Sequence, residues 1–140
     1  RIDPKNVVEI GPRGFNYPEH YYFIKESGIT IFTPKDVYTQ GAKTIAQKAL
    51  EIAGNGTDAI YVTVDIDALD MAYALGSGGQ EPAGINHFQL ADMIREIAPA
   101  ANAIDFVEVN PMTDHKELTS HVCANLVLEY ISGVYLAKVK

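Results

Sequence analysis

The chain has 140 residues, a length that fits one domain or part of one. Hydrophobic residues make up 47% of it and charged residues 21%, so it is expected to fold rather than to stay disordered. A net charge of -7 argues against a nucleic-acid-binding protein, and no apolar run approaches the roughly 18 residues of a membrane-spanning helix. The one cysteine, Cys123, excludes an internal disulfide and favours a reducing, cytoplasmic location.

Short β-branched runs alternate with helical patterns along the chain. In chain order, the sequence predicts a strand over 6–11, a helix over 18–27, a strand over 29–32, a short helix over 35–38, a helix over 44–53, a strand over 59–64, a helix over 87–97, a strand over 103–109 and a helix over 117–131. Thr33 and Asn86 are expected to cap two of these helices, whereas Gly28 and Gly133 are expected to end two others.

Strands that alternate with helices imply βαβ units. The sequence therefore predicts an α/β fold, with three α/β/α layers and a mainly parallel sheet. The nearly continuous apolar run at 59–64 is typical of a strand buried on both faces. Ligand sites of such sheets lie beyond the carboxyl ends of the strands, so the residues just after each strand are the first candidates.

Three aspartates, Asp65, Asp67 and Asp70, follow the predicted strand at 59–64. Like charges this close repel one another, and partial burial adds to the cost, so a bound cation would stabilise them. Asp65 and Asp67 would share one face of an extended chain, and their hard oxygen ligands suit manganese or magnesium. The alternative is that the aspartates cap turns and face water. An EF-hand calcium loop fits poorly, because the glutamate that it needs is missing.

Glu108 is a further acidic residue, inside the otherwise apolar run at 103–109. It either faces a sheet edge or pairs with a cation, and a carboxylate is a natural partner for a guanidinium through two parallel hydrogen bonds. The histidines show no metal-ligand spacing and are interpreted as surface or satisfied polar positions: His20, His87, His115 and His121.

Several ordered motifs resemble the ureohydrolase family, which includes arginase, agmatinase and formiminoglutamase. The stretch 61–84 resembles the family's metal-binding signature at Thr63, Asp65, Asp67, Asp70, Gly76, Ser77, Gly78, Glu81, Pro82 and Gly84. The run 106–111 resembles a second family motif, which contains Glu108, and 10–14 resembles a glycine–arginine strand end. The resemblance covers essentially the whole chain, in the right order and spacing.

The resemblance implies that residues 1–140 are the C-terminal portion of a single arginase-like domain with two Mn²⁺ ions per active site. It implies that Asp65 and Asp67 are metal ligands and that Glu108 is the catalytic residue that holds the substrate guanidinium. Ser77 is expected to contact substrate, and Asp70 to order the loop. A metal-bridging hydroxide would attack the guanidinium carbon and yield urea and an amine.

The family's other metal ligands lie in G-G-x-H and H-x-D-x-H/D segments, and neither occurs in this sequence. The chain also opens on Arg1 rather than on methionine, with no signal-like segment before the first apolar run. We therefore expect that sequence is missing upstream, that the chain holds only part of the metal site, and that this segment alone is inactive.

The run 81–84 is more like the agmatinase branch than the arginase branch, so agmatine is the expected substrate, with formiminoglutamate and guanidinobutyrate as alternatives. Met71, Leu75 and Gln80 replace family prolines. They favour a rival reading, in which the protein is a non-catalytic relative that serves as a binding or oligomerisation module. An unrelated α/β protein with a magnesium site is a third possibility. The expected partners are a small guanidino substrate and further copies of the chain, in a trimer or hexamer, without nucleic acid or membrane.

Overall fold

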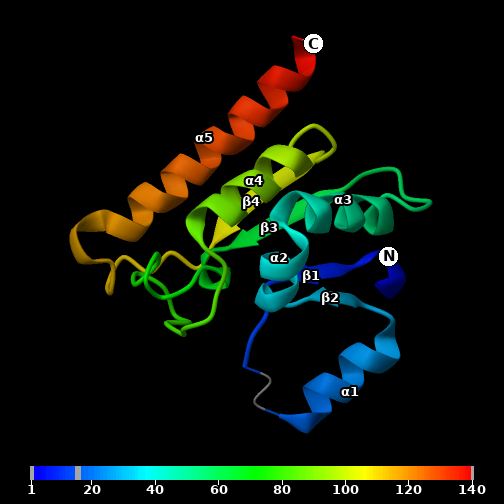
Figure 1. The fold of residues 1–140 in the computed structure, drawn as a ribbon, viewed down its shortest axis with the longest axis horizontal. Helices are drawn as coiled ribbons and strands as arrows, with labels where there is room; N and C mark the ends of the chain where they lie inside the picture. Colours follow the sequence, from blue (N-terminus) through cyan, green and yellow to red (C-terminus); the bar gives the residue numbers. More distant parts are fainter. Residues whose placement is uncertain (1, 15–16, 140) are drawn as a thin grey trace.

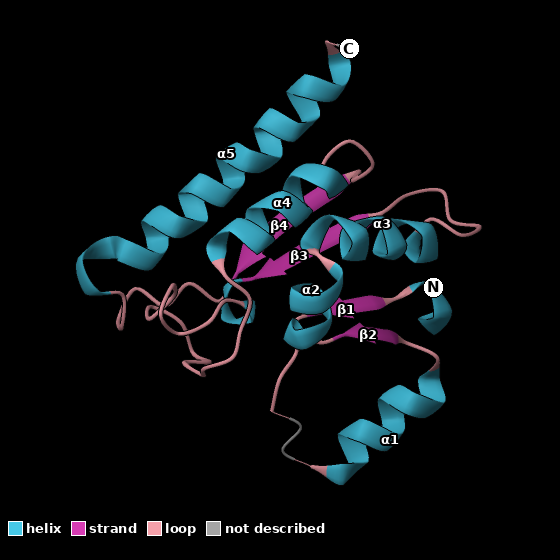
Figure 2. Cartoon of the chain, in the orientation of Figure 1, coloured by secondary structure: helices cyan, strands magenta, loops and turns pink. Residues whose placement is uncertain are grey.

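Helices and strands alternate along the chain in the predicted order. The computed structural model describes residues 2–14 and 17–139. Its strands are β1 (Val8–Ile10), β2 (Thr30–Phe32), β3 (Tyr61–Asp65) and β4 (Ala103–Val107), drawn in Figures 1 and 2. Its α-helices are α1 (Pro18–Ser27), α2 (Pro34–Gln40), α3 (Ala42–Ala53), α4 (His87–Ile97) and α5 (Leu118–Lys138). Short 3₁₀ turns occur at η1 (Pro4–Asn6), η2 (Ile66–Ala68) and η3 (His115–Glu117).

The strands form two parallel pairs. β1 pairs with β2, and β3 pairs with β4. Asp65 lies opposite Val107, so β3 and β4 end level with each other. Within 2–14 and 17–139 no hydrogen-bond ladder joins the two pairs, yet both contribute apolar side chains to one core beneath α3 and α4. The predicted parallel α/β character is therefore confirmed.

One side of the β3–β4 pair lies open. Val62 and Val64 face the core, but Tyr61 is 62% exposed and Thr63 is also exposed. The prediction that this strand is buried on both faces is therefore wrong for the described chain. Helix α1 adds little cover anywhere, because none of its residues is buried. Of the three expected layers, the described residues form the sheet and one helix layer.

Several helices begin or end at the capping residues and glycine that the sequence predicts. Thr33 and Asp36 form a capping box at the start of α2, and Asn86 and Gln89 form another at the start of α4. Gly28 follows α1 with a φ of 86°, a left-handed conformation that favours glycine. None of the described helices combines the length and the hydropathy needed to cross a membrane.

Helix α5 corrects one prediction. It continues to Lys138 instead of ending at Gly133, which is buried within it. A Cβ on Gly133 would lie 2.7 Å from the Cβ of Ala98 and 3.0 Å from the carbonyl oxygen of Arg95. The glycine therefore lets α5 approach the end of α4 closely, and its role is packing rather than helix termination.

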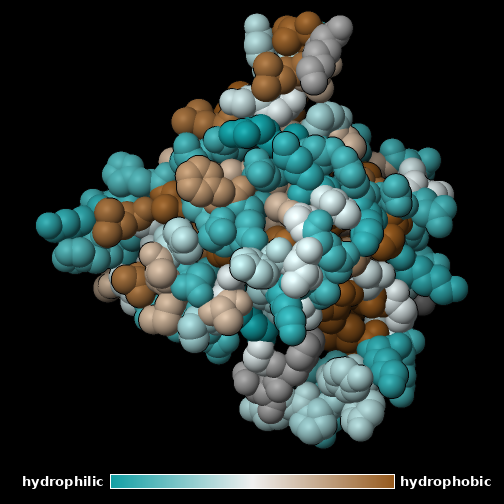
Figure 3. Space-filling view, in the orientation of Figure 1, coloured by the Kyte–Doolittle hydropathy of each residue, from teal (hydrophilic) through white to brown (hydrophobic). Residues whose placement is uncertain are grey.

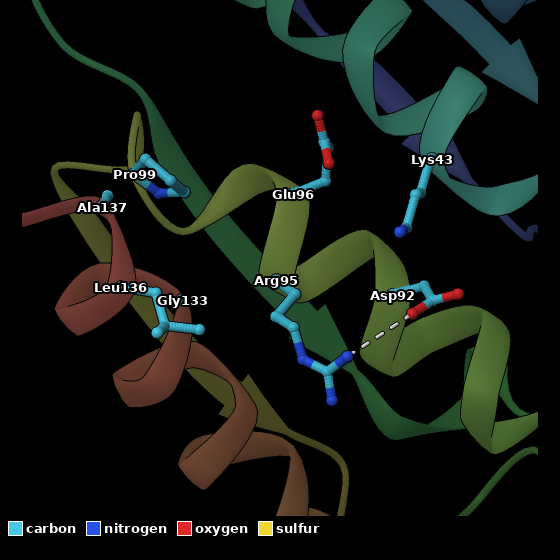
Figure 4. A pocket seen from close by; sticks show the side chains of 8 residues that line it. All are labelled: Lys43, Asp92, Arg95, Glu96, Pro99, Gly133, Leu136 and Ala137. Atoms are coloured by element: carbon cyan, nitrogen blue, oxygen red, sulfur yellow. Dashed lines mark ion pairs between the residues drawn. The ribbon is translucent and has the colours of Figure 1, made fainter. Parts of the chain in front are cut away.

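A shallow pocket borders this contact, as Figure 4 shows. Arg95 reaches from α4 to Glu129 of α5 at 2.6 Å and to Asp92 at 3.7 Å. The pocket lies near the end of α4, where the chain turns toward the amino end of β4. It is thus remote from the residues that follow the carboxyl ends of the strands.

The close contact at Gly133 predicts an unusual response to alanine. In an open helix, Gly→Ala would stabilise by about 1 kcal/mol, but overpacking costs roughly 1–3 kcal/mol. We expect Gly133→Ala to lower the free energy of unfolding by about 1 kcal/mol in urea titrations. The exposed neighbour Ser132→Ala should change it by less than about 0.5 kcal/mol. A Gly133→Ala variant as stable as the parent would contradict this account of the α4–α5 contact.

Candidate active site

Asp65 is the last residue of β3, and Asp67 lies in the 3₁₀ turn that follows. The Oδ1 atom of Asp65 accepts a hydrogen bond from the backbone N–H of Asp67 at 2.8 Å. The expectation that the two aspartates share a face of an extended chain is therefore wrong. The chain turns immediately after Asp65, and this turn, rather than strand alternation, keeps the two carboxylates near each other.

Asp67 is held tightly by the glycine-rich part of the loop. A Cβ on Gly79 would lie 2.6 Å from its Oδ2 atom, so only a glycine leaves room for the carboxylate there. The Oδ1 atom of Asp67 is buried and has no hydrogen-bond partner among the described residues. A buried carboxylate oxygen without a donor is costly, and a bound cation would remove that cost.

Glu108 follows β4 directly, because the strand ends at Val107 and not at residue 109 as predicted. Its φ of 68° lies in the left-handed region, which costs a residue with a Cβ of the order of 1 kcal/mol or more. Such strain often marks a functional position. The side chain is exposed and lies close enough to Asp65 for their charges to interact.

The structure thus brings Asp65, Asp67 and Glu108 to the level ends of β3 and β4. The pKa of the Asp65 carboxyl is raised, first by partial burial and then by repulsion from Asp67 and Glu108. The N–H of Asp67 and the charge of Arg13 oppose this shift. The group therefore carries more negative charge than the surrounding chain compensates.

Asp70 orders the loop, as expected. Its carboxylate accepts hydrogen bonds from the backbone N–H groups of Ala72 at 2.9 Å and Gly84 at 3.2 Å, which closes the loop between residues 70 and 84. These N–H groups, that of Ala72 foremost, hold the pKa of Asp70 below its ordinary value.

Ser77 and Gln80 also serve the loop. Ser77 is 3% exposed and donates to the carbonyl of Ala74 at 3.2 Å, so its contact with substrate stays a prediction. Gln80, one of the residues that replace family prolines, donates through Nε2 to the carbonyls of Leu75 and Ser77. In this chain a side-chain hydrogen bond thus shapes the loop at a position where the ureohydrolase signature has a proline, whose ring restricts the backbone.

Arg13 belongs to the glycine–arginine strand end at 10–14, and the sequence analysis assigned it no role in the site. It lies beyond β1 and donates to four backbone carbonyls of the acidic loop. The available signal was its place at a strand end, as a lone cation facing a predicted cluster of aspartates.

The described residues fit part of a metal site. Asp65 and Asp67 offer carboxylate oxygens of the kind that Mn²⁺ prefers, one of them buried and unpartnered. Within 2–14 and 17–139, however, no cluster of three or more histidine, cysteine, aspartate or glutamate side chains could hold an ion. His87, for example, contacts Asn125 at 2.9 Å instead. A complete ligand set therefore needs groups beyond those that these residues bring together.

Comparison with known protein families matches residues 1–132 to the arginase family. The chain belongs to this family. A formimidoylglutamase of Halalkalibacterium halodurans is 35% identical over 133 residues, which are 92% of this chain and 41% of that protein. An agmatinase of Bacillus subtilis is 33% identical over 135 residues, or 94% of this chain and 43% of that protein. The crystal structure of an arginase from Bacillus subtilis superposes with a TM-score of 0.83 at 29% identity, over 91% of this chain and 45% of that one.

The resemblance to ureohydrolases and the arginase-like fold are therefore confirmed. The chain spans less than half the length of these relatives. Their names cover three different substrates at similar identity, so membership of the arginase family does not single out agmatine.

The raised pKa of Asp65 predicts that its charge destabilises the metal-free fold. A folded-state pKa above the ordinary 3.8 means that the folded state holds the proton more tightly. The free energy of unfolding should therefore fall as pH rises through the interval above 3.8. With a chelator at pH 7, Asp65→Asn should match or exceed the parent in stability, by less than about 1 kcal/mol because solvent still reaches the partly buried side chain. The gain should shrink below about pH 4, and thermal melts at both pH values measure it.

Asp36 provides a control of opposite sign. The hydroxyl and N–H of Thr33 hold the pKa of Asp36 below 3.8, so its charge stabilises the fold above that pH and the benefit is lost as pH falls. Asp36→Asn should therefore lower the melting temperature at pH 7. A loss of stability in Asp65→Asn at pH 7 equal to that in Asp36→Asn would contradict the conclusion that the charge of Asp65 destabilises the fold.

Proposed function

We propose that the protein containing this chain hydrolyses a guanidino or related amidine compound, with Asp65 and Asp67 as manganese ligands and Glu108 as the substrate-binding residue. The observation that carries the proposal is the group of three carboxylates at the level ends of β3 and β4, with a buried and unpartnered oxygen on Asp67. Membership of the arginase family supports the reaction class.

The three carboxylates would divide two tasks between them, metal binding and substrate binding. Bound manganese would supply hydroxide at neutral pH, by lowering the pKa of water. Asp65 and Asp67 would hold the ions through their free oxygens, while the hydrogen bond from the N–H of Asp67 fixes the orientation of Asp65. Glu108 would accept two hydrogen bonds from the substrate guanidinium and hold it at the strand ends, beside the ions.

Water adds to the guanidinium carbon, and the bond from that carbon to the substituted nitrogen then breaks. This nitrogen takes up a proton from the water and leaves as an amine. The other product is urea. For a formimidoyl substrate, the same cleavage releases formamide instead, because its carbon bears hydrogen in place of the third nitrogen. The product therefore reports the substrate class directly.

Agmatine is our first choice of substrate, because the run 81–84 resembles the agmatinase branch. In the test, the natural protein that carries this sequence is incubated with agmatine, arginine or formimidoylglutamate. Each substrate is tried with Mn²⁺ and with a chelator. Urea from one of the first two, or formamide from the third, should appear only with the metal. No product from any of the three, together with no bound Mn²⁺, would favour the non-catalytic binding or oligomerisation module.

The roles of the carboxylates predict different kinetic losses. Asp67→Asn should lower kcat and metal affinity by about 10- to 100-fold or more. Glu108→Gln should lower kcat/KM by about 10- to 100-fold, because a charge-assisted hydrogen bond contributes roughly 1.5–3 kcal/mol, and it should leave bound Mn²⁺ unchanged. Asp92 is a half-buried aspartate on α4, so Asp92→Asn is the matched control and should retain the parent rates. A Glu108→Gln enzyme with unaltered kcat/KM would remove Glu108 from the site.

We also propose that the protein assembles as a trimer or hexamer. The supporting observation is a group of apolar side chains that are 50–63% exposed, on the C-terminal half of α5 and on the residue after it: Ile131, Tyr135, Leu136 and Val139. They gather toward the upper end of the molecule in Figure 3. Light scattering on a sizing column should give three or six times the monomer mass, and Ile131→Glu should reduce it. A monomeric parent would refute this assembly without touching the catalytic proposal.

A further inference from the structure

Arg13 binds both arms of the acidic loop. Its Nη1 atom donates to the carbonyl of Ala68 at 3.2 Å, and Nη2 donates to that of Leu69 at 3.1 Å. Nη2 also lies 3.3 Å from the carbonyl of Glu81 and 3.5 Å from that of Gly79. The first two carbonyls follow Asp67 in the chain, and the other two belong to the arm that returns toward α4.

Asp67 lies between these two arms. Ala68 is its neighbour in the chain, and Gly79 is the residue that leaves space for its Oδ2 atom. Both residues contribute a carbonyl to the same guanidinium. The position of Asp67 therefore depends on the separation of the two arms, and the guanidinium sets this separation together with backbone hydrogen bonds.

The arginine reaches the loop from the other pair of strands. Gly11, at the end of β1, has a φ of 87°, and a Cβ on it would lie 3.5 Å from the Cβ of Ala68. The turn after β1 is thus packed against the loop that follows β3, although no ladder joins these strands among the described residues. Arg13 is the polar link between the two pairs at their carboxyl ends.

Backbone hydrogen bonds also join the two arms, but in the described chain none of them links Gly79 to the residues that follow β3. The N–H of Met71 donates to Glu81 at 3.1 Å, and the N–H of Ile85 donates to Ala68 at 3.1 Å. A planar guanidinium can serve several acceptors in fixed directions at once, whereas the ammonium of lysine is a single point of charge. The geometry of the loop therefore calls for arginine rather than for any cation.

We propose that Arg13 is a positioning residue of the active site: by joining the two arms of the loop, it fixes Asp67, and with it the pair of metal ligands. Its role in metal binding rests on the proposed function. Its role in ordering the loop does not.

The test uses the natural protein with Arg13→Gln and Arg13→Lys, and with Arg95→Gln as the matched control, since Arg95 also bridges two elements but lies far from the loop. The probe is Mn²⁺ alone, with free ion counted by its electron paramagnetic resonance signal. Amide hydrogen exchange without metal gives a second readout, at Met71 and Ile85 in the loop and at Ile94 in α4.

Arg13→Gln should weaken Mn²⁺ binding about 10- to 100-fold and speed exchange at Met71 and Ile85 but not at Ile94. Arg13→Lys should fall between Arg13→Gln and the parent, and Arg95→Gln should match the parent in Mn²⁺ affinity. Parent-like affinity and exchange in Arg13→Gln would overturn the proposal. So would parent-like values in Arg13→Lys, because a point charge would then suffice.

The two proposals fail in different ways. A parent protein that binds no Mn²⁺ and gives no product contradicts the proposed function, and the exchange data still decide the part played by Arg13 in the loop. If Arg13→Gln speeds exchange throughout α4 as well, it has destabilised the whole fold. The decision then passes to Arg13→Lys, for which parent-like exchange in the loop again overturns the proposal.

Discussion

A partly buried carboxylate close to two others, at the level ends of β3 and β4, is the constraint on which the site depends. Parallel pairing sets Asp65 opposite Val107, so Asp65 at the end of β3 and Glu108 just after β4 lie at the same edge. With Asp65, Asp67 and Glu108 at this edge, the chain places negative charge where the fold gives it little relief. Such carboxylates destabilise the metal-free fold but suit a cation. This pattern is expected of a metal site, where stability is exchanged for function.

The long loop after β3 can be understood as a frame around Asp67. Gly79 leaves space for the carboxylate, Asp70 closes the loop through backbone N–H groups, and Arg13 holds its arms from the neighbouring strand pair. These polar contacts act together with the burial of Leu69, Ala74 and Ile85, which anchor the loop in the core. Such a frame can hold a charged ligand in one position while leaving its free oxygens available.

The sequence predicted features whose causes are local and missed those that depend on distant parts of the chain. The starts of α2 and α4 follow from capping residues three positions apart, and these were predicted correctly. Gly133 carries the same local signal as Gly28, but a contact with Ala98, 35 residues away, lets the helix continue through it. Likewise, alternation placed Asp65 and Asp67 on one face, whereas the chain leaves the strand between them. The candidate residues could be predicted because aspartates after a strand are conspicuous in sequence. Their relative geometry could not be predicted, because it depends on the turn that follows the strand.

Substrate choice must arise away from the three carboxylates. Glu108 would bind the cationic group at the reacting end, which arginine and agmatine share, so it cannot distinguish them. Relatives named for different substrates are indeed about equally similar to this chain. The part of the loop that departs from the ureohydrolase signature says more about substrate choice. There Gln80, which replaces a proline, donates a hydrogen bond to the carbonyl of Leu75. A loop shaped in this way can follow another path over the outer end of a substrate while the metal ligands beneath it stay in place. We therefore expect variation in this segment to alter substrate specificity at little cost to the reaction chemistry.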